Sequence, residues 1–589
     1  MSTHSAQHHA SKFTSRQRTI ALVIVALAFV MDLLDNTIVN IAIPSIRDNL
    51  GASYATIQWL IAGYALSFAV LLITGGRMGD VFGYKKLFMW GVGGFTFASL
   101  LSGIAWNSEV LIAARLLQGG MAALMVPQVM SLMQVMYKPH ERGQIMGIFG
   151  ALAGVAASLG PVIGGILIHF NIAGLDWRPI FLINIPVGIF ALIMAARYLP
   201  DGKSPHPLKL DIVGTLLIVL AMFLVVFPLI EGRDLDWPIW GYLMMASAAP
   251  VLLVFVWWQG VKERRDKSPL IVPSLLRTRT FVTGLIINII FEGAMIGFFL
   301  PFTLLIQVGL GYEVIKAALT GIPTAIGISV AMAVFSQRII PKLGRYTMTL
   351  GTVIMASGLG LVWYFIHTYG IDTSPWAFVP GLLVTGAGMA LIMAPMFSVV
   401  LTDVDAKHAG SASGVLNAVQ QLGGAIGTAL IGVFFFGNLV SHAPASFASV
   451  EPQIRSQLAQ VQLPTQVKDQ IISGAKTCFV DTNKQKDESQ VPESCKKLEA
   501  ASTPKNLPAG FDQLPDAEKS LYFKQSAEHA NKIVGIIQAG VKKANTENFI
   551  DSFRVAIIFE VVILSIVFAL SFLLPRHIRP EAAEEGANL

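Results

Sequence analysis

The chain has 589 residues, of which 54% are apolar and only 13% are charged, and its mean hydropathy is +0.63. A soluble domain carries about 25% charged residues, so this composition excludes a set of water-covered globular domains. We therefore expect a lipid bilayer to be the main solvent. The net charge of +6 comes from basic residues in short segments between apolar runs, which argues against nucleic acid as a partner.

Fourteen apolar stretches follow one another along the chain, and each is long enough for a helix of about 20 residues to cross the hydrocarbon core. The first is too long for a signal peptide, whose apolar core has about 7–15 residues, so we interpret it as an uncleaved span. The sequence thus predicts an all-α integral membrane protein with fourteen transmembrane helices. The expected spans are 19–43, 54–75, 87–106, 108–132, 142–168, 177–198, 210–230, 239–258, 280–305, 315–337, 347–367, 376–401, 409–438 and 549–574.

Basic residues gather in alternate loops, as the positive-inside rule predicts for cytoplasmic segments. With the N-terminus in the cytoplasm, the short outer loops hold only Arg47, Arg178, Arg233 and Lys316. An even number of spans then places both termini in the cytoplasm of a bacterial inner membrane. The basic residues on the cytoplasmic side are Lys12, Arg16, Arg18, Arg77, Lys85, Lys86, Lys138, Arg142, Arg197, Lys203, Lys209, Lys262, Arg264, Arg265, Lys267, Arg277, Arg279, Arg338, Lys342, Arg345, Lys407, Arg576 and Arg579.

A polar, lysine-rich segment, 439–548, interrupts the apolar pattern before the last span. This topology places it outside, where long domains do not obey the charge rule, and two amphipathic stretches within it predict helices. The chain's only two cysteines, Cys478 and Cys495, lie here. In an oxidising compartment they can form a disulfide worth about 3 kcal/mol of local stability; two free thiols are the alternative.

A weak internal repeat divides the chain into two halves. GGRMGDVFGYKKLF at 75–88 is echoed by SQRIIPKLGRYTMTL at 336–350, with Gly83 aligned to Gly344. Such repeats are one transporter design, with the substrate site between the halves. We expect a cytoplasmic tail (1–18), an N-terminal six-helix half (19–200), a two-helix linker with a cytoplasmic loop (201–279), five helices of the C-terminal half (280–438), a periplasmic helical domain (439–548), the last helix (549–574) and a cytoplasmic tail (575–589).

Several motifs, in this order and spacing, resemble the 14-helix drug/proton antiporters of the major facilitator superfamily. The resemblance implies a multidrug efflux permease similar to bacterial quaternary-ammonium and uncoupler efflux pumps. The motifs are LLDNTIVNIAIP (33–44), GRMGDVFGYKK (76–86), LIAARLLQGG (111–120), GPVIGG (160–165), WRPIFLINIPVG (177–188) and AGSASGVLNAVQQLGGAIG (409–427).

Two acids, Asp32 and Asp35, lie one turn apart in the middle of the first expected helix. A carboxylate at the bilayer centre costs about 2.5–3.5 kcal/mol and usually marks an ion or substrate path. Burial favours its protonated form, whereas a bound cation favours its charged form and expels the proton. This competition can couple two fluxes. Asp35 matches the acid of the family motif, and a hydrogen-bonded structural carboxylate is the alternative for both.

Three further charged residues lie within expected spans. Arg115 is deep in the fourth, so we expect an acidic partner, either Asp32 or Asp35. The resemblance implies a proton relay for Arg115, and a structural ion pair is the alternative. Glu292, in the second half, is a candidate second proton site or contact for a cationic substrate, and Glu560 is a weaker candidate because it can pair locally.

Glycine-rich motifs complete the set of candidate sites. Residues Gly154, Gly160, Pro161, Gly164 and Gly165 match the antiporter motif and predict a bend and close helix contacts, either as a seal against leak or as ordinary small-residue packing. The resemblance further implies a latch joining the two halves in the outward-facing state, and topology determination is the alternative. The latch residues are Gly76, Asp80, Gly83, Lys85 and Lys86.

The chain lacks a G-x-x-x-x-G-K-[ST] phosphate loop and zinc-like His/Cys spacing. We therefore expect a secondary transporter rather than an enzyme, with no cofactor or metal and with protons as the coupling ion. The leading hypothesis is a monomer that exports small hydrophobic or cationic compounds from the cytoplasm or inner leaflet. One alternative is an exporter of acidic or hydrophobic toxins, lipids or a metabolite, acting with a periplasmic adaptor and outer-membrane channel. Another is a membrane sensor that uses the outer domain.

Overall fold

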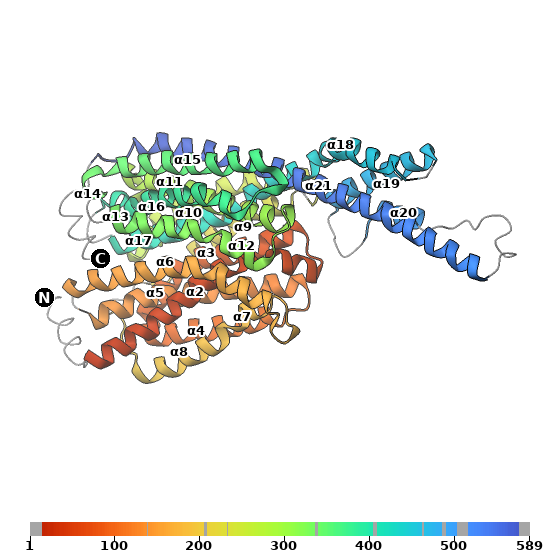
Figure 1. Ribbon diagram of the computed structural model, residues 1–589. Coiled ribbons are helices and arrows are strands. Elements are labelled where there is room, and N and C mark those ends of the chain that lie inside the picture. Colours follow the sequence, from red (N-terminus) through yellow and green to blue (C-terminus); the bar gives the residue numbers. More distant parts are fainter. Residues whose placement is uncertain are drawn as a thin grey trace.

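The computed structural model describes residues 15–137, 139–204, 209–232, 234–335, 340–404, 409–461, 464–485, 491–502 and 516–576. Within these ranges the chain is helical and contains no strand, which confirms the all-α prediction. Figure 1 shows an elongated bundle of helices with an arm projecting from one end. Both expected tails lie largely outside the described residues, as do Lys12, Lys138, Arg233, Arg338, Lys407 and Arg579.

The N-terminal half forms one side of the bundle. Side-chain caps start two of its helices, because Ser53 accepts a hydrogen bond from the Thr56 amide and Asn107 accepts one from the Val110 amide. Its elements are α2 (Ser15–Leu50), α3 (Tyr54–Phe82), α4 (Tyr84–Gly103), α5 (Ser108–Met136), α6 (Pro139–His169), the short turn η1 (Ile172–Gly174), α7 (Pro179–Leu182) and α8 (Asn184–Tyr198).

The C-terminal half forms the other side and contains two π-helical segments that interrupt long helices. Its elements are α11 (Arg279–Leu304), η3 (Leu305–Gly309), α12 (Val314–Thr320), α13 (Ile322–Phe335), α14 (Ile340–Leu343), α15 (Arg345–Tyr369), η4 (Gly370–Asp372), α16 (Pro375–Val400), α17 (Ala409–Ile431), η6 (Gly432–Phe436) and the membrane part of α21 (Asp516–Ser571).

The expected linker pair is α9 (Ile212–Glu231) and α10 (Ile239–Asp266), followed by the turn η2 (Leu275–Arg277). Helix α9 covers the seam where α3 meets α17, with apolar residues of all three helices in one cluster. Helix α10 packs mainly on α9. It leaves Leu253 72% exposed, as expected for a surface that faces lipid.

Equivalent contacts in the two halves support the internal repeat. Gly83 (φ 100°) and Gly344 (φ 52°) both have a positive φ, which glycine tolerates best, and each precedes a helix. After Gly83, the Lys85 ammonium donates to the Ala196 carbonyl near the end of α8 (2.9 Å). After Gly344, the Arg345 guanidinium donates to the carbonyls of Phe572 (2.6 Å) and Leu574 (2.9 Å) at the end of α21. Each basic residue therefore ties the third helix of its half to the last.

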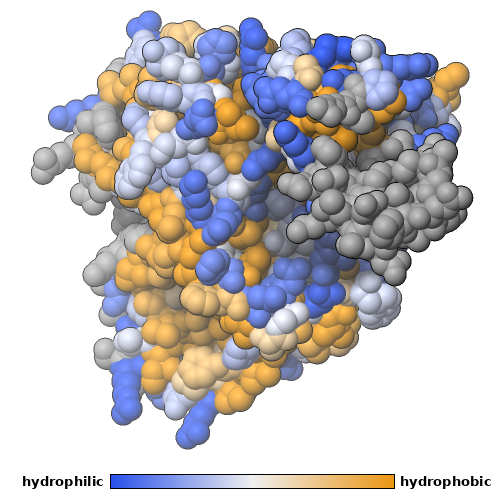
Figure 2. All heavy atoms as spheres, turned by 45° about the vertical axis from the view of Figure 1, so that its right-hand side comes forward, coloured by the Kyte–Doolittle hydropathy of each residue, from blue (hydrophilic) through white to orange (hydrophobic). Residues whose placement is uncertain are grey.

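Twelve helices of the described residues are long and apolar enough to cross a membrane. The two remaining stretches that the sequence predicts as spans, 87–106 and 142–168, are helical too, as α4 and α6. They fall outside the twelve, and in α6 only Leu159–His169 forms an uninterrupted described apolar helix. The count of fourteen stays a prediction. Figure 2 shows apolar residues gathered on the flank of the bundle, where lipid is expected.

The arm consists of α18 (Gly437–Ala459), α19 (Thr465–Lys484), α20 (Glu493–Ser502) and the first part of α21. It has its own apolar core, which includes Phe447, Ile472 and Phe479. A disulfide joins Cys478 in α19 to Cys495 in α20. The arm projects from the end of the bundle opposite to the start of α2 and the end of α21 (Figure 1). We call these the arm end and the opposite end.

Side chains of α21 fix the base of the arm to the bundle. Thr546 donates its hydroxyl to the Gly309 carbonyl (2.6 Å) and Asn545 donates its amide to the Val308 carbonyl (3.4 Å). Both acceptors belong to the π-helical segment η3, whose irregular end leaves carbonyls available. The arm is therefore anchored to the C-terminal half.

Candidate functional site

Asp35 lies at the centre of a buried polar network in the N-terminal half. Its Oδ2 is 2.5 Å from Nη1 of Arg115, and its Oδ1 accepts hydrogen bonds from Gln118 and Asn184, both at 2.8 Å. The side chains of Asp35 and Arg115 are at most 1% exposed. Helices α2, α5 and α8 each supply part of this network. Both carboxylate oxygens of Asp35 therefore have a hydrogen-bond donor, and one of these donors is a cation.

Arg115 makes further contacts besides its ion pair with Asp35. Its Nε donates to the Leu60 carbonyl of α3 (3.2 Å) and its Nη1 also donates to the Gln118 amide oxygen (2.7 Å). The guanidinium lies over the ring of Tyr64, 4.2 Å from its centroid, a cation–π contact. The partner that the sequence left open between two acids is therefore Asp35.

Asp32 has a different environment, although it lies one turn from Asp35 on α2. Its only hydrogen-bond donor among the described residues is the Tyr64 hydroxyl, and it makes no ion pair there. It is 7% exposed, against 1% for Asp35. With Arg115 neutralising Asp35, an ionised Asp32 leaves one uncompensated negative charge in the network, and a proton on Asp32 removes it.

Four members of this network were not among the candidate site residues, although Gln118 and Asn184 lie within two of the quoted motifs. Tyr64, Ser99, Gln118 and Asn184 lie in α3, α4, α5 and α8, and the Ser99 hydroxyl accepts from the amides of Gln118 (2.9 Å) and Asn184 (3.3 Å). Their signal in the sequence was a hydrogen-bonding side chain within an apolar span. This signal alone does not tell which of many such residues face one another.

Glu292 provides one of the membrane carboxyl groups of the C-terminal half. Its Oε1 accepts a hydrogen bond from Gln420 of α17 (2.6 Å). The two helices approach closely because of glycines: a Cβ on Gly423 would lie 3.0 Å from the Glu292 Cβ, and one on Gly427 would lie 2.3 Å from the Gly293 Cα. Glu292 therefore lies at a tight helix crossing and has an uncharged partner.

The glycines of the expected antiporter motif face two different neighbours. Cβ atoms on Gly160 and Gly164 would lie 2.0 Å from Thr37 and 2.7 Å from Ile38 of α2, within the same half. A Cβ on Gly165 would lie 2.8 Å from the Ala318 Cβ of α12, in the other half. Pro161 is inside α6, and the surroundings of Gly154 lie outside the described residues. The motif thus combines packing within a half with contact between halves.

The halves meet near the arm end. Tyr54 of α3 stacks on Phe436 of η6 with ring centroids 4.1 Å apart. The Gln307 amide of η3 donates to the Ile41 carbonyl of α2 (3.2 Å). Together with Gly165 and Ala318, these contacts connect the halves on both sides of the bundle at this end.

The contacts around the expected latch lie within the N-terminal half and the first residues of the linker. Besides the Lys85 contact, the Tyr84 hydroxyl donates to Asp80 (2.9 Å) and the Tyr84 amide to the Gly202 carbonyl (2.8 Å). A Cβ on Gly76 would lie 3.6 Å from the Pro127 Cβ, and Lys86 is exposed. A latch between the halves in an outward-facing state stays a prediction.

Arg77, in the same loop motif, is a buried residue whose role the motif did not indicate. Its guanidinium donates to the carbonyls of Lys209 (3.3 Å), Ser268 (2.8 Å) and Pro269. Both chain segments flank the linker pair α9 and α10. Arg77 therefore holds the ends of this pair against α3.

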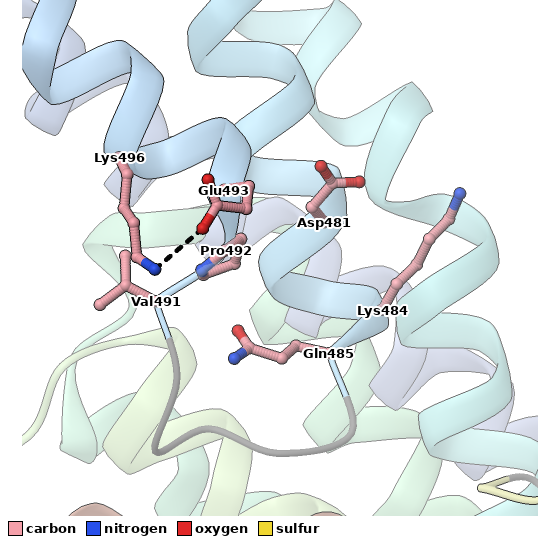
Figure 3. Close-up of a pocket in the computed structure, with 7 residues that line it drawn as sticks. All are labelled: Asp481, Lys484, Gln485, Val491, Pro492, Glu493 and Lys496. Carbon is pink, nitrogen blue, oxygen red and sulfur yellow. Dashed lines mark hydrogen bonds and ion pairs between the residues drawn. The ribbon is translucent and has the colours of Figure 1, made fainter.

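A surface pocket of the arm is separate from all these groups. Figure 3 shows it between α19 and α20, with the Lys496–Glu493 ion pair (3.0 Å) at its edge. No cluster of three or more metal-binding side chains occurs among the described residues. The pocket is lined by Asp481, Lys484, Gln485, Val491, Pro492, Glu493 and Lys496.

Comparisons with known proteins agree with this architecture. Residues 25–428 match the model of the Major Facilitator Superfamily. A probable actinorhodin transporter of Streptomyces coelicolor is 37% identical over 565 residues, 96% of this chain and 93% of that protein. The puromycin resistance protein of Streptomyces alboniger is 31% identical over 74% of this chain and 86% of its own. The tetracenomycin C resistance and export protein of Streptomyces glaucescens is 30% identical over 72% and 78%.

Solved transporters share the fold at low sequence identity. A bacterial homologue of the human lysosomal transporter Spinster has a TM-score of 0.53 and 14% identity, covering 95% of this chain and 97% of its own. A bacterial homologue of the human peptide transporters PepT1 and PepT2 has a TM-score of 0.50 and 14% identity, covering 94% and 98%.

Proposed function

This chain belongs to the major facilitator superfamily, and we propose that it is a proton-coupled antiporter that exports antibiotic-like compounds. Membership makes it a multi-pass membrane protein and a secondary transporter. The observation that carries the proposal is the buried network in which, among the described residues, two acids, Asp32 and Asp35, lie beside one cation, Arg115, which pairs with Asp35. Such a network is neutral with one proton and negative without it.

We assign different roles to the two acids of α2. The three donors to Asp35, one of them a guanidinium, favour a permanent charge pair that positions the helices. Asp32, with one neutral donor, is the proton carrier. This reverses the order that the motif suggested, in which Asp35 was the leading candidate, and the reason is that the motif does not indicate where Arg115 binds.

Coupling follows from charge. A cationic or partly cationic substrate near Asp32 favours the ionised carboxylate and expels the proton, and a returning proton releases the substrate. Glu292, hydrogen-bonded only by the neutral Gln420 among the described residues, can exchange a proton in the other half in the same way. A membrane potential of about 100 mV adds about 2.3 kcal/mol for each proton that enters.

The substrate class is proposed from the relatives. Their names refer to actinorhodin, puromycin and tetracenomycin C. We therefore propose that this chain exports antibiotic-like molecules. We further propose that the arm end faces outward and that both termini are cytoplasmic, as the distribution of basic residues predicts. The cycle needs no cofactor, and a monomer contains both halves.

The test uses the purified wild-type protein in proteoliposomes with an imposed pH gradient. The probes are ethidium as a lipophilic cation, and puromycin and tetracenomycin C as antibiotics. Accumulation against the concentration gradient, abolished by a protonophore, would support antiport. Equal movement with and without the pH gradient would contradict it.

A second candidate function concerns the arm. The match to the probable actinorhodin transporter covers 96% of this chain, so most of the arm lies within the matched length. We propose as the alternative that the arm docks a periplasmic adaptor leading to an outer-membrane channel. Deleting 447–541 keeps Thr546 on Gly309; an adaptor-dependent exporter would then lose cellular resistance but keep transport in proteoliposomes, whereas a sensor would lose its response.

A further inference from the structure

A fourth membrane carboxyl group, on Glu560 of α21, has no hydrogen-bond partner among the described residues. Both of its oxygens are buried and unpartnered, and the side chain is 0% exposed. Acidic residues are almost never fully buried unless they are paired. An unpaired ionised carboxylate inside a protein costs several kcal/mol, so Glu560 is accommodated in this conformation as the neutral acid.

The neighbouring helix leaves space for this side chain. A Cβ on Gly297 of α11 would lie only 2.2 Å from Oε1 of Glu560, and 4.0 Å from the Ile431 Cβ of α17. Any larger residue at position 297 would have to displace the carboxyl group. Glu560 therefore occupies a gap where α11, α17 and α21 meet.

The position of this gap relates it to Glu292. Gly297 follows Glu292 by five residues on α11, which corresponds to about 7.5 Å along a helix axis. The neighbouring residues on α17 follow the same order along the chain: Gln420 lies beside Glu292, and Ile431, eleven residues later, lies beside Gly297. Glu560 thus lies nearer the arm end than Glu292, along the same helix crossing.

Several charged or titratable side chains on α15 and α21 contact groups other than Glu560. Arg345 of α15 binds carbonyls at the end of α21, His367 of α15 stacks on Trp363, and Arg554 of α21 lies over the same Trp363 ring. Asp372 belongs to the turn η4, and α17, η3 and η6 carry no charged side chain. Among the described residues, none of these groups forms an ion pair with Glu560.

We propose that Glu560 is a proton-binding site of the transport cycle. A proton that enters from the arm end binds Glu560 first and then passes to Glu292. The inference rests on the proposed proton coupling. A proton from outer water forms an O–H bond on the Glu560 carboxylate. That bond breaks when the carboxylate of Glu292 takes the proton, directly or through water, and nothing is oxidised or reduced. If this position only packed against apolar neighbours, leucine would be more stable there, since a neutral acid still leaves its O–H group unpaired.

Infrared difference spectroscopy tests proton binding without a transported substrate. The carbonyl stretch of a protonated carboxylic acid is followed through a pH titration of the wild type, Glu560→Gln, Glu560→Asp and, as a matched control, Asp551→Asn, which removes an exposed acid of the same helix. We expect a titrating band in the wild type and in Asp551→Asn that Glu560→Gln lacks. A band that is lost in Glu560→Gln but does not change with pH would show a permanently neutral structural acid and overturn the proposal.

Transport in proteoliposomes supplies the second measurement. For Glu560→Gln we expect gradient-driven accumulation of the probes to fall by about tenfold or more, with exchange of probe for probe across the membrane nearly unchanged and partial recovery in Glu560→Asp. An equal loss of both activities would point to a structural role and contradict the proposal. Absence of gradient-driven transport in the wild type would instead overturn the proposed coupling, while the infrared titration would still decide whether Glu560 binds a proton.

Discussion

At the residue scale, two acids of one helix differ because of what surrounds them. Asp35 receives hydrogen bonds from Arg115, Gln118 and Asn184, whereas Asp32 receives one from Tyr64. In the proposed mechanism, Asp35 fixes a buried cation and Asp32 holds an exchangeable proton. The difference arises from side chains of three other helices, α3, α5 and α8, of which α3 directly follows α2 in the sequence.

Asp35→Asn tests the structural half of this assignment. The change leaves the buried Arg115 without its anion, and breaking a buried pair in this way costs about 3–5 kcal/mol. We expect a large drop in thermal stability of the purified protein in detergent. The double variant Asp35→Asn with Arg115→Gln should recover part of the loss, because it removes the unpaired charge. A single variant as stable as the wild type would contradict the assignment.

The sequence predicted part of this network and missed the rest. Asp32, Asp35 and Arg115 are recognisable because charged residues are costly in an apolar span. Tyr64, Gln118 and Asn184 are not, because uncharged polar residues occur in many spans and their partners depend on how helices are rotated. The pairing of Arg115 with Asp35 rather than Asp32 likewise needed the structure.

At the element scale, close approach between helices decides which parts of the molecule move together. Helix α9 is hydrogen-bonded to α3 near both ends, through Thr215 with Thr74 (2.7 Å) and Glu231 with Trp59 (2.7 Å). Its contact with α17 is apolar. We therefore expect the linker pair to move together with the N-terminal half when the two halves move relative to each other, while α17 slides along α9. The sequence identified the pair as an insertion but gave no indication of which half holds it.

Arg77→Ala tests the attachment of this pair. The substitution leaves three carbonyls around the linker without their charged donor, and hydrogen bonds to charged groups contribute about 1.5–3 kcal/mol each. We expect a lower melting temperature and faster proteolysis in the loop that contains Ser268. Lys86→Ala, which removes an exposed cation of the same motif, is the control and should change neither. Equal behaviour of the two variants would argue against this role of Arg77.

Gly165→Val tests the contact between α6 and α12. The new side chain would meet the Ala318 Cβ, where an alanine cannot move aside, so the halves would separate near the arm end. We expect a cysteine placed at position 41, beside Gln307, to react faster with a water-soluble maleimide in this variant. Gly174→Ala is not a suitable control because Gly174 has a positive φ; Gly437→Ala is suitable because open space surrounds Gly437. Unchanged labelling in Gly165→Val would contradict a sealing role.

At the scale of the whole molecule, two halves and an arm form a single continuous framework. Helix α21 runs from the arm into the C-terminal half, and Thr546 fixes it to η3 at the boundary. The sequence predicted the two halves from one repeated motif and the arm from its composition. It did not predict that helices of the membrane bundle extend without a break into the arm. The reason is that a change from apolar to polar composition usually suggests that a helix ends.

Replacing both Cys478 and Cys495 by serine tests whether the arm takes part in transport. Loss of a disulfide that closes a loop of this size costs about 3 kcal/mol, so we expect faster cleavage of the arm in limited proteolysis. Transport in proteoliposomes should be unchanged, because the proposed proton path lies within the bundle. A parallel loss of gradient-driven transport would show that the arm contributes to the cycle itself.

The central claim is that Asp32 carries the coupled proton, and the most direct measurement compares Asp32→Asn with the wild type in proteoliposomes. An asparagine can still accept the Tyr64 hydrogen bond but cannot release a proton. We expect Asp32→Asn to fold, to exchange probe for probe across the membrane, and to lose accumulation driven by the pH gradient. If Asp32→Asn accumulates the probes against a gradient as the wild type does, the proton is carried elsewhere and the account of this site is wrong.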